Sequence, residues 1–425
     1  MKVVEFPLRN DWAGLLRRPA IDNSALQETV RNVMRTVKNG GDSAVKKFTK
    51  EFDGVELAGV LVTQDEFNDA AALVSAELRA AIQQAADNVR LFHEKQVGAV
   101  EIIETMPGIQ CWRKSIGIEK VGLYIPGGTA PLFSTILMLG IPAAIAGCKE
   151  VILCSPPGKD GKLHPAILFA AQLVGITKVF KIGGVQAIAA MAYGTETVPQ
   201  VYKIFGPGNQ YVTCAKQLVQ QEGIAIDMPA GPSEVCVLAD ASANASFVAA
   251  DLLSQAEHGA DSQVLLVTTE KSFVEQVQAA VQTQLSLLPR RDLAAKALDN
   301  STAIVVSNMD EAIALVNEYA AEHLIIACDK DEEIATRIMN AGSVFLGNYS
   351  PESVGDYASG TNHTLPTNGF AKAYSGVSVD SFVKKITYQK LTKKGLENIG
   401  NTVMVMARAE GLQAHADAVG IRLKN

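Results

Sequence analysis

Residues 178–193 read KVFKIGGVQAIAAMAY, and this segment predicts one strand, one glycine turn and one helix. The run 178–182 contains β-branched and aromatic residues, as in a buried strand. Gly183 and Gly184 end it, and the apolar run 185–193 is typical of a helix. A glycine turn at the start of a helix can bind a phosphate group. A tight turn that serves only the backbone geometry would have the same sequence pattern, so both interpretations remain open.

The same alternation of strand and helix extends through most of the chain beyond residue 117. Helical patterns separate most of the short apolar runs, which favours βαβ units and largely parallel sheets. The expected strands cover residues 121–125, 150–154, 178–182, 201–204, 235–238, 263–268, 303–306, 324–327 and 343–346. Two groups of such units divide near Gly231, so the sequence predicts two α/β lobes with a cleft between them.

Helical patterns dominate both ends of the chain. Before residue 117 they cover 25–38, 41–52 and a long run from 66 to about 95. The tail from about residue 378 is expected to be helical and polar on one face, like an arm separate from both lobes.

Length, charge and cysteine spacing restrict the class of protein. The 425 residues suffice for about two to three domains, and a net charge of −7 without a Lys/Arg run argues against nucleic acid or an anionic membrane as partner. Residues 121–148 carry no charge, but prolines and glycines interrupt them, so we expect buried core rather than a membrane span. The N-terminus lacks an apolar export signal and the six cysteines show no C-x-x-C spacing, which together indicate a reducing cytoplasm.

The segment LSQAEHGADS, residues 253–262, carries the first candidate site. It follows an amphipathic stretch that reads as a helix from Asn244, stopped by Gly259. Gln255 and His258 are three residues apart, so their side chains leave one face of that helix and could form half of a metal site. Taken alone, a histidine beside a glutamine is more often a surface or core residue.

Two further segments and the tail carry side chains suited to chemistry. Glu322 and His323 stand just before an apolar strand, where an acid and an imidazole can form a general-base pair. Both serve one site only if the chain is still irregular there, since neighbours in a regular strand point to opposite faces. Asp356 lies in a polar loop, 350–363, and offers a hard oxygen ligand, although an Asx turn is the plainer explanation. His415 lies on the tail, where a surface histidine is the ordinary interpretation.

Together these segments resemble the histidinol dehydrogenase family, from about residue 20 to the C-terminal tail. The matching motifs are GLYIPGG (122–128), IFGPGN (204–209), DMPAGPSE (227–234), LSQAEHG (253–259), EHL (322–324) and GDYASGTNH (355–363). The turn at 206–208 lacks the third glycine of a dinucleotide fingerprint, which agrees with the incomplete Rossmann-like lobes of this family.

The resemblance implies a zinc-dependent enzyme that oxidises L-histidinol through L-histidinaldehyde to L-histidine with two NAD+, in the last steps of histidine biosynthesis. It implies the following roles: Gln255, His258, Asp356 and, from the neighbouring subunit, His415 as ligands of one zinc ion; Tyr124, Gln186 and Asn209 as NAD contacts; Ser233, Gln255, His258, His323, Asp356, Glu410 and His415 as substrate contacts; Glu322 and His323 as the catalytic pair. It also implies a homodimer in which Glu410 and His415 serve the partner's site.

The resemblance further divides the chain into four parts. They are an N-terminal segment (1–20), a discontinuous metal and substrate lobe (21–123 and 231–377), an NAD-binding lobe (124–230) and a C-terminal arm (378–425) that reaches the partner. The expected fold class is therefore α/β, with two incomplete Rossmann-like lobes, an N-terminal helical segment and a C-terminal helical arm.

The residues suit this chemistry, and three alternatives stay open. An imidazole such as His323, with an unperturbed pKa of about 6.5, can take the hydroxyl proton as hydride leaves, and Glu322 would activate the water that hydrates the aldehyde. Zinc would orient the substrate. The alternatives are another NAD-dependent amino-alcohol or aldehyde dehydrogenase, a thiol-dependent aldehyde dehydrogenase using Cys148 or Cys154, and a two-lobed solute-binding protein.

Overall fold

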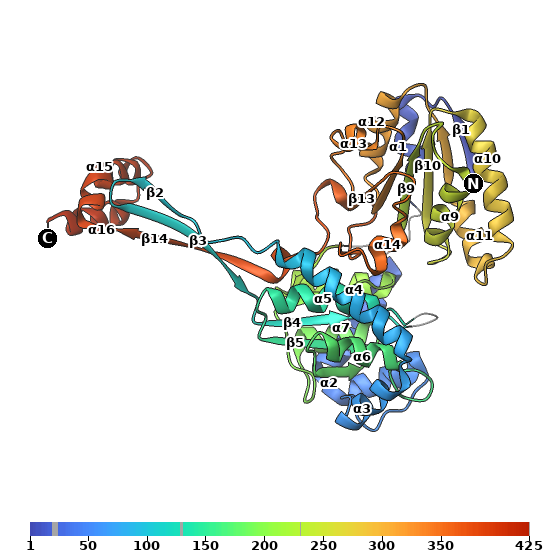
Figure 1. Ribbon diagram of the computed structural model, residues 1–425. Coiled ribbons are helices and arrows are strands. Elements are labelled where there is room, and N and C mark those ends of the chain that lie inside the picture. Colours follow the sequence, from blue (N-terminus) through green and yellow to red (C-terminus); the bar gives the residue numbers. More distant parts are fainter. Residues whose placement is uncertain (19–23, 128–130, 230, 425) are drawn as a thin grey trace.

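The computed structural model describes residues 1–18, 24–127, 131–229 and 231–424. It contains two parallel sheets and one three-stranded antiparallel ribbon. Figure 1 shows each parallel sheet in its own lobe, with the ribbon carrying a pair of helices away from both. The α/β class is confirmed.

The five-stranded sheet is doubly wound around its first strand. Its order is β6-β5-β4-β7-β8, with strands β4 (Lys120–Tyr124), β5 (Glu150–Ser155), β6 (Lys178–Lys181), β7 (Lys203–Phe205) and β8 (Ala225–Ile226). One face is buried by helices α2 (Ser24–Phe48), α7 (Gly184–Tyr193) and α8 (Gln210–Gln221). The other is buried by α3 (Gln64–Leu73), α4 (Ala76–Glu94), α5 (Phe133–Ile145) and α6 (Pro165–Leu173). The strand order reverses between β4 and β7, where doubly wound sheets bind ligands.

The six-stranded sheet is built in the same way. Its order is β1-β11-β10-β9-β12-β13, with strands β1 (Lys2–Glu5), β9 (Glu234–Ala239), β10 (Gln263–Thr268), β11 (Thr302–Val305), β12 (His323–Ala327) and β13 (Ser343–Leu346). Helices α9 (Ala245–Ala256), α10 (Lys271–Leu285) and α11 (Arg291–Asp299) bury one face, and α1 (Trp12–Leu15), α12 (Met309–Tyr319) and α13 (Asp331–Ala335) bury the other. Because both faces are covered, β9 and β10 are buried along their whole length, as apolar runs in parallel sheets are.

Local sequence signals explain where several helices start and break. Asn209 begins α8 and Asn244 begins α9, and each side chain accepts hydrogen bonds from two backbone N–H groups. Within α2, Gly41 has φ 52° and ψ −139°, which accounts for the break that the sequence predicts between 38 and 41. The remaining short elements are η1 (Arg9–Asp11), η2 (Thr49–Asp53), α14 (Glu352–Tyr357), η3 (Phe370–Lys372) and η4 (Val379–Phe382).

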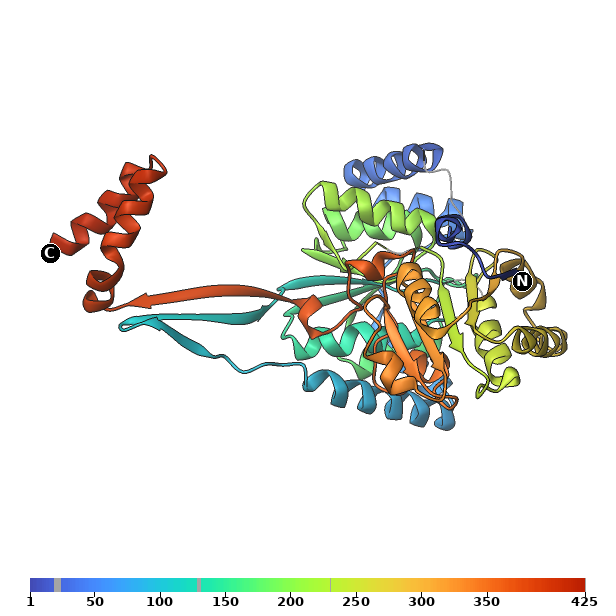
Figure 2. The same cartoon turned by 90° about the horizontal axis from the view of Figure 1, so that it is seen from above.

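The arm consists of the antiparallel ribbon and the two last helices. Its elements are β2 (Ile102–Met106), β3 (Ile109–Gly117), β14 (Val383–Leu391), α15 (Lys393–Ala409) and α16 (Gln413–Lys424). Figure 2 shows the ribbon extended, with α15 and α16 at its far tip, away from both lobes. At its base the ring of Phe382 stacks on Phe205 of the five-stranded sheet, with centroids 4.0 Å apart. Stacking in the core thus anchors the arm to one lobe.

Most expected elements are present. Each of the nine expected strands corresponds to a strand of the structure within a few residues. The uncharged run 121–148 is confirmed as core in its described part, since it forms β4 and the buried helix α5.

The tail differs from expectation at its start. Residues 383–391 form β14, paired with β3 over nine residues, and helices follow only from residue 393. Nearly all of β14 is exposed, so the strand has no apolar face that would distinguish it from a polar helix in the sequence.

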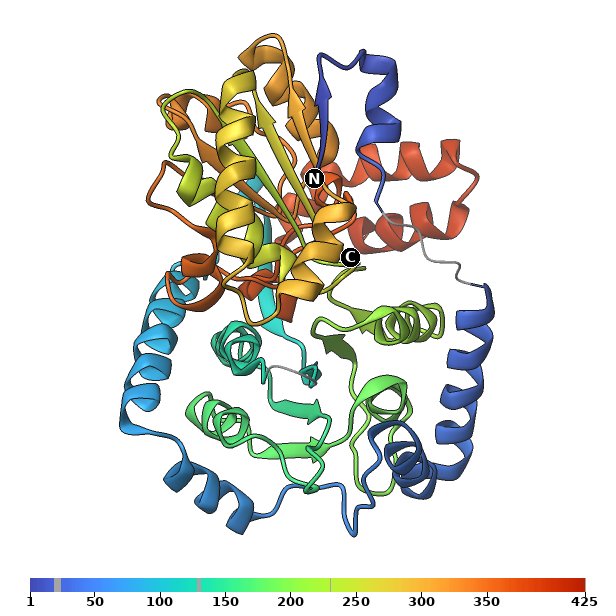
Figure 3. The same cartoon turned by 90° about the vertical axis from the view of Figure 1, so that its right-hand side faces the viewer.

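The grouping of segments into lobes also differs from expectation. Residues 24–94 were expected to join the six-stranded lobe, but α2, α3 and α4 pack on the five-stranded sheet, as Figure 3 shows. The expected boundary at 124 divides β4, which begins at Lys120, and the N-terminal segment supplies β1 at the edge of the six-stranded sheet. The pattern of an amphipathic helix predicts that one face covers a sheet, but it does not identify the sheet. The lobe to which α2, α3 and α4 belong is therefore known only from their packing.

Candidate active site

Glu322 and His323 lie at the amino-terminal edge of the six-stranded sheet. β12 begins at His323, which stands opposite Val235 of β9. Because Glu322 still precedes the strand, the two side chains converge, with Oε2 of Glu322 3.7 Å from Nδ1 of His323. They are only 7% and 3% exposed. The irregular backbone on which a shared site depends is therefore present.

Helix α14 brings two carboxylates to the same imidazole. Oδ1 of Asp356 lies 3.3 Å from Nε2 of His323, and Oε2 of Glu352 lies 3.9 Å from Nδ1. Burial alone would lower the pKa of His323, but the carboxylates of Glu322, Asp356 and Glu352 outweigh it and raise that pKa. Burial raises the pKa of Glu322 and of Glu352. The site thus holds several acids that compete for protons around one base.

The loop that contains α14 is tied to the other lobe. The ring of His363 uses Nδ1 to bond the backbone oxygen of Asp356 at 2.7 Å and Nε2 to bond the hydroxyl of Thr135 on α5 at 3.0 Å. The side chain of Asn88 on α4 donates to the backbone oxygen of Ala358 at 2.8 Å. These bonds fix Asp356 between the lobes, and Figure 1 shows α14 at their boundary.

Gln255 and His258 reach the same edge from α9. A helix that connects parallel strands runs antiparallel to them, so the C-terminal end of α9 lies where β9 and β12 begin. Gln255 is fully buried, whereas the helix ends at Ala256 and His258 follows in a turn, its N–H 3.2 Å from the oxygen of Gln255. The His258 imidazole is exposed, yet surrounding protein removes enough water to lower its pKa, an effect that the nearby Asp356 carboxylate opposes.

Several buried donors and acceptors of this cluster form no hydrogen bond, although Nε2 of His323 and Oδ1 of Asp356 lie within ion-pair distance of each other. Five buried atoms make no hydrogen bond: Oε1 and Nε2 of Gln255, Nε2 of His323, Oε2 of Glu352 and Oδ1 of Asp356. Buried polar atoms are rarely left unsatisfied, so their concentration here fits a site that binds a polar or ionic group. Amide oxygen, imidazole and carboxylate form a donor set that suits zinc. Within the described ranges, no three His, Cys, Asp or Glu side chains form a ready-made metal site, so a metal held here would also need the Gln255 amide or a ligand from a second chain.

Glu410 and His415 are not brought to this cluster by their own chain. Glu410 caps the end of α15 and His415 lies in α16, and both are exposed. Figure 2 places these helices at the tip of the arm, far from the lobes. Ser233, by contrast, immediately precedes β9, and its backbone oxygen accepts from the N–H of Gln263 at 3.1 Å.

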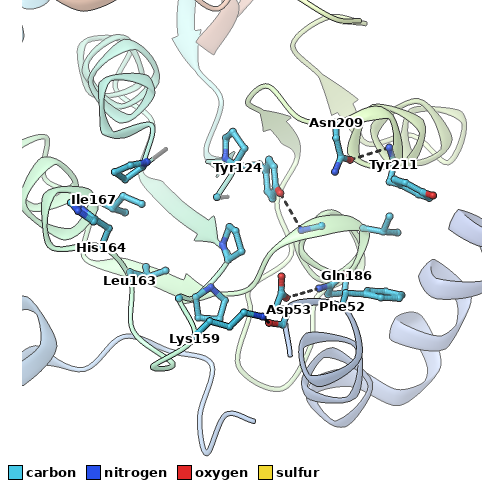
Figure 4. Close-up of a pocket in the computed structure, with 18 of the residues that line it drawn as sticks. Phe52, Asp53, Tyr124, Lys159, Leu163, His164, Ile167, Gln186, Asn209 and Tyr211 are labelled. Atoms are coloured by element: carbon cyan, nitrogen blue, oxygen red, sulfur yellow. Dashed lines mark hydrogen bonds between the residues drawn. The ribbon is translucent and has the colours of Figure 1, made fainter. Parts of the chain in front are cut away.

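A second site lies at the carboxyl edge of the five-stranded sheet. A pocket of about 1050 Å³ is lined by Tyr124, Gln186 and Asn209, the residues that the resemblance assigns to NAD. The hydroxyl of Tyr124 accepts from the N–H of Gly184 at 3.1 Å, and Asn209 caps α8, as Figure 4 shows. Burial raises the pKa of Tyr124 to about 12, so this phenol stays neutral. The pocket therefore combines apolar walls with the starts of three helices, α6, α7 and α8.

Sequence reasoning missed two acidic residues at these sites. Glu352 stands four residues before Asp356, so a helix there would have placed both on one face, but the segment was expected to be a loop. Asp53 lines the pocket, and its Oδ2 accepts from Nε2 of Gln186 at 3.5 Å. No sequence signal distinguished Asp53 from an exposed carboxylate.

The cysteines do not provide an activated thiol at either of the positions considered. Cys154 is fully buried, and burial raises its pKa far above the ordinary value. Burial also raises the pKa of Cys148 to about 11. A nucleophilic cysteine needs the opposite shift, so this geometry disfavours the thiol-dependent alternative.

Comparison with known proteins agrees with this geometry. The family model for histidinol dehydrogenase matches residues 16–423. A histidinol dehydrogenase of Bacteroides thetaiotaomicron is 59% identical over 423 residues, covering 100% of this chain and 99% of the relative, and one of Xanthomonas euvesicatoria is 52% identical over 97% of this chain and 98% of the relative. Among the described residues no helix combines the length and apolarity that a membrane crossing needs.

Solved structures give the same result. The crystal structure of histidinol dehydrogenase from Elizabethkingia anophelis superposes with a TM-score of 0.98 at 55% identity, covering 100% of this chain and 98% of that one. An acetylating aldehyde dehydrogenase from Geobacillus thermoglucosidasius matches with a TM-score of 0.51 at 16% identity, covering 86% and 96%, which shows a shared fold alone. A family model over nearly the whole chain and full-length relatives above half identity show that this chain belongs to the histidinol dehydrogenase family and is an oxidoreductase.

Proposed function

We propose that this chain oxidises L-histidinol through L-histidinaldehyde to L-histidine, using two NAD+ and one zinc ion per site. The observation that carries this proposal is the buried cluster at the sheet edge, where His323 lies 3.7 Å from Glu322 and 3.3 Å from Asp356 and where Gln255, His323 and Asp356 have buried polar atoms without a hydrogen bond. The family membership supports the substrate. The six unpaired cysteines suit the cytoplasmic location expected from the sequence.

In the first oxidation His323 takes the hydroxyl proton of the alcohol while hydride leaves the same carbon. NAD supplies the hydride acceptor. The Nδ1 of His323 lies 3.3 Å from the backbone oxygen of Glu234, which can only accept, so Nδ1 carries hydrogen and Nε2 is the basic atom. Asp356 is one of three carboxylates that favour the imidazolium of His323, and holding a zinc ion would engage this carboxylate and so weaken its effect on the imidazole.

In the second oxidation Glu322 removes a proton from water as that water adds to the aldehyde, and His323 returns the proton that it took from the alcohol to the aldehyde oxygen, which gives the hydrate. The hydrate then loses its hydroxyl proton and its hydride in the same way as the alcohol, and a carboxylic acid results. Burial raises the pKa of Glu322 toward the range in which a carboxylate is an effective general base. Glu322 is therefore needed only where water enters.

The metal ligands in this proposal are Gln255, His258 and Asp356, with His415 of a second chain completing the set. Zinc, when bound, supplies a Lewis-acidic anchor for the substrate's imidazole and amine. Tyr124, Gln186 and Asn209 hold NAD in the second pocket. The exposed arm supports a homodimer in which each chain lends Glu410 and His415 to the other site.

The proposal is tested by the absorbance change of NAD reduction when histidinol is added, with and without a chelator. Two NADH per histidinol, lost on chelation and restored by zinc, are expected. Histidinol binding without NAD reduction would instead favour a solute-binding protein. Reduction that survives complete metal removal would contradict the zinc requirement, and oxidation of other amino alcohols in preference to histidinol would contradict the substrate.

A further inference from the structure

The backbone of one residue, Glu234, holds both members of the catalytic pair. Its N–H donates to Oε2 of Glu322 at 2.9 Å, and its carbonyl oxygen lies 3.3 Å from Nδ1 of His323. Glu234 is the first residue of β9, directly beside the start of β12. A small rotation of this one residue would therefore move the contacts of both side chains together.

The side chain of Glu234 is itself fixed by Arg18. Nε and Nη2 of Arg18 donate to the two carboxylate oxygens at 2.9 Å each, a two-point contact that defines orientation as well as distance. The backbone N–H of Asn368 adds a third bond at 2.8 Å, and Glu234 is only 1% exposed. A buried carboxylate with three donors leaves its backbone little freedom.

Arg18 also fixes the chain just before the catalytic pair. Its Nη2 donates to the backbone oxygen of Tyr319 at 2.7 Å, and its guanidinium carbon lies 3.9 Å from the centre of the Tyr319 ring. Tyr319 ends α12, three residues before Glu322. Arg18 thus contacts both Glu234 at the start of β9 and the end of α12, which leads into the catalytic pair.

A second part-buried ion pair, Lys181–Glu66, serves as a comparison because it has no connection to the catalytic pair. Lys181 and Glu66 are 2.9 Å apart, and Lys181 is as buried as Arg18, although Glu66 is more exposed than Glu234. Apart from Lys181, Glu66 bonds only the N-cap of its own helix. The Arg18–Glu234 contact differs because it continues through one backbone residue to Glu322 and His323.

We propose that Arg18 is a positioning residue for the oxidation, because its two-point contact with Glu234 fixes the peptide groups that orient Glu322 and His323. This inference rests on the catalytic roles proposed above for that pair. Arg18 makes no contact with Glu322 or His323 themselves, so it acts through Glu234 and, on the other side, through the backbone at Tyr319.

A charge effect accompanies the geometric one. Burial is the main cause that raises the pKa of Glu322, the Glu234 carboxylate raises it further, and Arg18 neutralises that carboxylate. The other groups that act on Glu322 are its neighbour His323, Asp356 on α14 and Tyr319 on α12. Loss of Arg18 alone should therefore move the acidic limb of the aldehyde-oxidation profile to higher pH, since Glu322 works as a base only when ionised.

The test compares Arg18→Met, Arg18→Lys and the double variant Arg18→Met/Glu234→Gln in the zinc-loaded enzyme. Arg18→Met should lower kcat of both oxidations by roughly tenfold to a hundredfold, with KM for NAD unchanged, because only orientation of the reacting groups is lost. In Arg18→Met the acidic limb of the pH profile for aldehyde oxidation should move to higher pH. In the double variant this limb should lie at the wild-type pH again, since no unpaired charge is left beside Glu322. Arg18→Lys keeps the charge without the two-point geometry, so kcat should fall while the limb stays in place.

Glu66→Gln is the matched control and should lower the melting temperature without changing kcat or the pH profile. A merely structural Arg18 would behave like this control, and that result in Arg18→Met would overturn the inference. If Arg18→Met does not fold, an Arg18→Lys enzyme with wild-type kcat for both steps would overturn it equally. Should Glu322→Gln and His323→Asn be fully active, the proposed function fails; if they are inactive and the Arg18 variants are normal, only this inference fails.

Discussion

The exposed arm leads to a quantitative test of the shared site. His258 follows α9 beside the catalytic pair, whereas His415 lies in α16 at the tip of the ribbon. If each site takes His258 from one chain and His415 from the other, His258→Asn and His415→Asn homodimers should both be nearly inactive. In a mixed dimer, however, both lesions fall in one site and the other site is intact.

The expected recovery follows from counting sites. Unfolding and refolding an equal mixture gives roughly half mixed dimers, each with one of two sites intact, and so roughly a quarter of wild-type activity. Wild-type enzyme taken through the same refolding supplies the reference. If His415 served its own chain, every site would keep one lesion and mixing would restore nothing. That outcome would refute the shared site.

A second mixture gives the reverse contrast. The double variant His258→Asn/His415→Asn is refolded with an equal amount of wild type. With shared sites both sites of every mixed dimer carry a lesion, so only wild-type homodimers work and roughly a quarter of the activity remains. With sites inside one chain, the mixed dimer keeps one good site and roughly half remains. Because the two arrangements differ in opposite directions in the two mixtures, incomplete refolding cannot imitate either result.

Three further predictions follow from the site and the arm. His323→Asn should depress both oxidations, but Glu322→Gln should slow aldehyde oxidation more than alcohol oxidation; single-turnover traces from each substrate measure this, and equal losses would contradict the water-activating role. His258→Asn should release zinc, measured by atomic absorption, and weaken histidinol binding with NAD affinity unchanged; a zinc-free variant with normal histidinol affinity would count against the anchoring role. Phe382→Ala removes a fully buried ring that stacks on Phe205, so it should cost about 3–5 kcal/mol in denaturant unfolding, and a cost below about 1 kcal/mol would show that this contact does not anchor the arm.

The fold could be predicted wherever the core imposes a pattern on the sequence. Strands such as 263–268 are buried on both faces, so they appear as continuous apolar runs between turns. The ribbon could not be found in this way, since β2 and most of β14 are exposed and carry no buried face. The sequence also could not predict the lobe to which α2 belongs, because an amphipathic pattern does not identify the sheet that the helix covers.

The candidate site was predictable only in part from its residue types. Glu322 and His323 are adjacent, so their motif and their geometry coincide once the strand starts at His323. Arg18 and Glu234 lie 216 residues apart, and nothing in either local sequence predicts that they meet. A contact of this kind depends on how the chain after α1 packs against the start of β9, which is a property of the whole lobe.

The two lobes use opposite edges of similar sheets, and this contrast bears on which ligand each one suits. Tyr124 ends β4 and Asn209 follows β7, at the edge where helices α7 and α8 present their N-termini, the positive end of the helix dipole. An anionic dinucleotide suits that edge. Gln255 stands instead at the C-terminal end of α9, beside the amino ends of β9 and β12, where the dipole is negative and favours a cation. We propose that the five-stranded lobe binds NAD and that the six-stranded lobe binds the metal. The direction of the helices in each lobe agrees with this assignment, independently of the identity of the side chains.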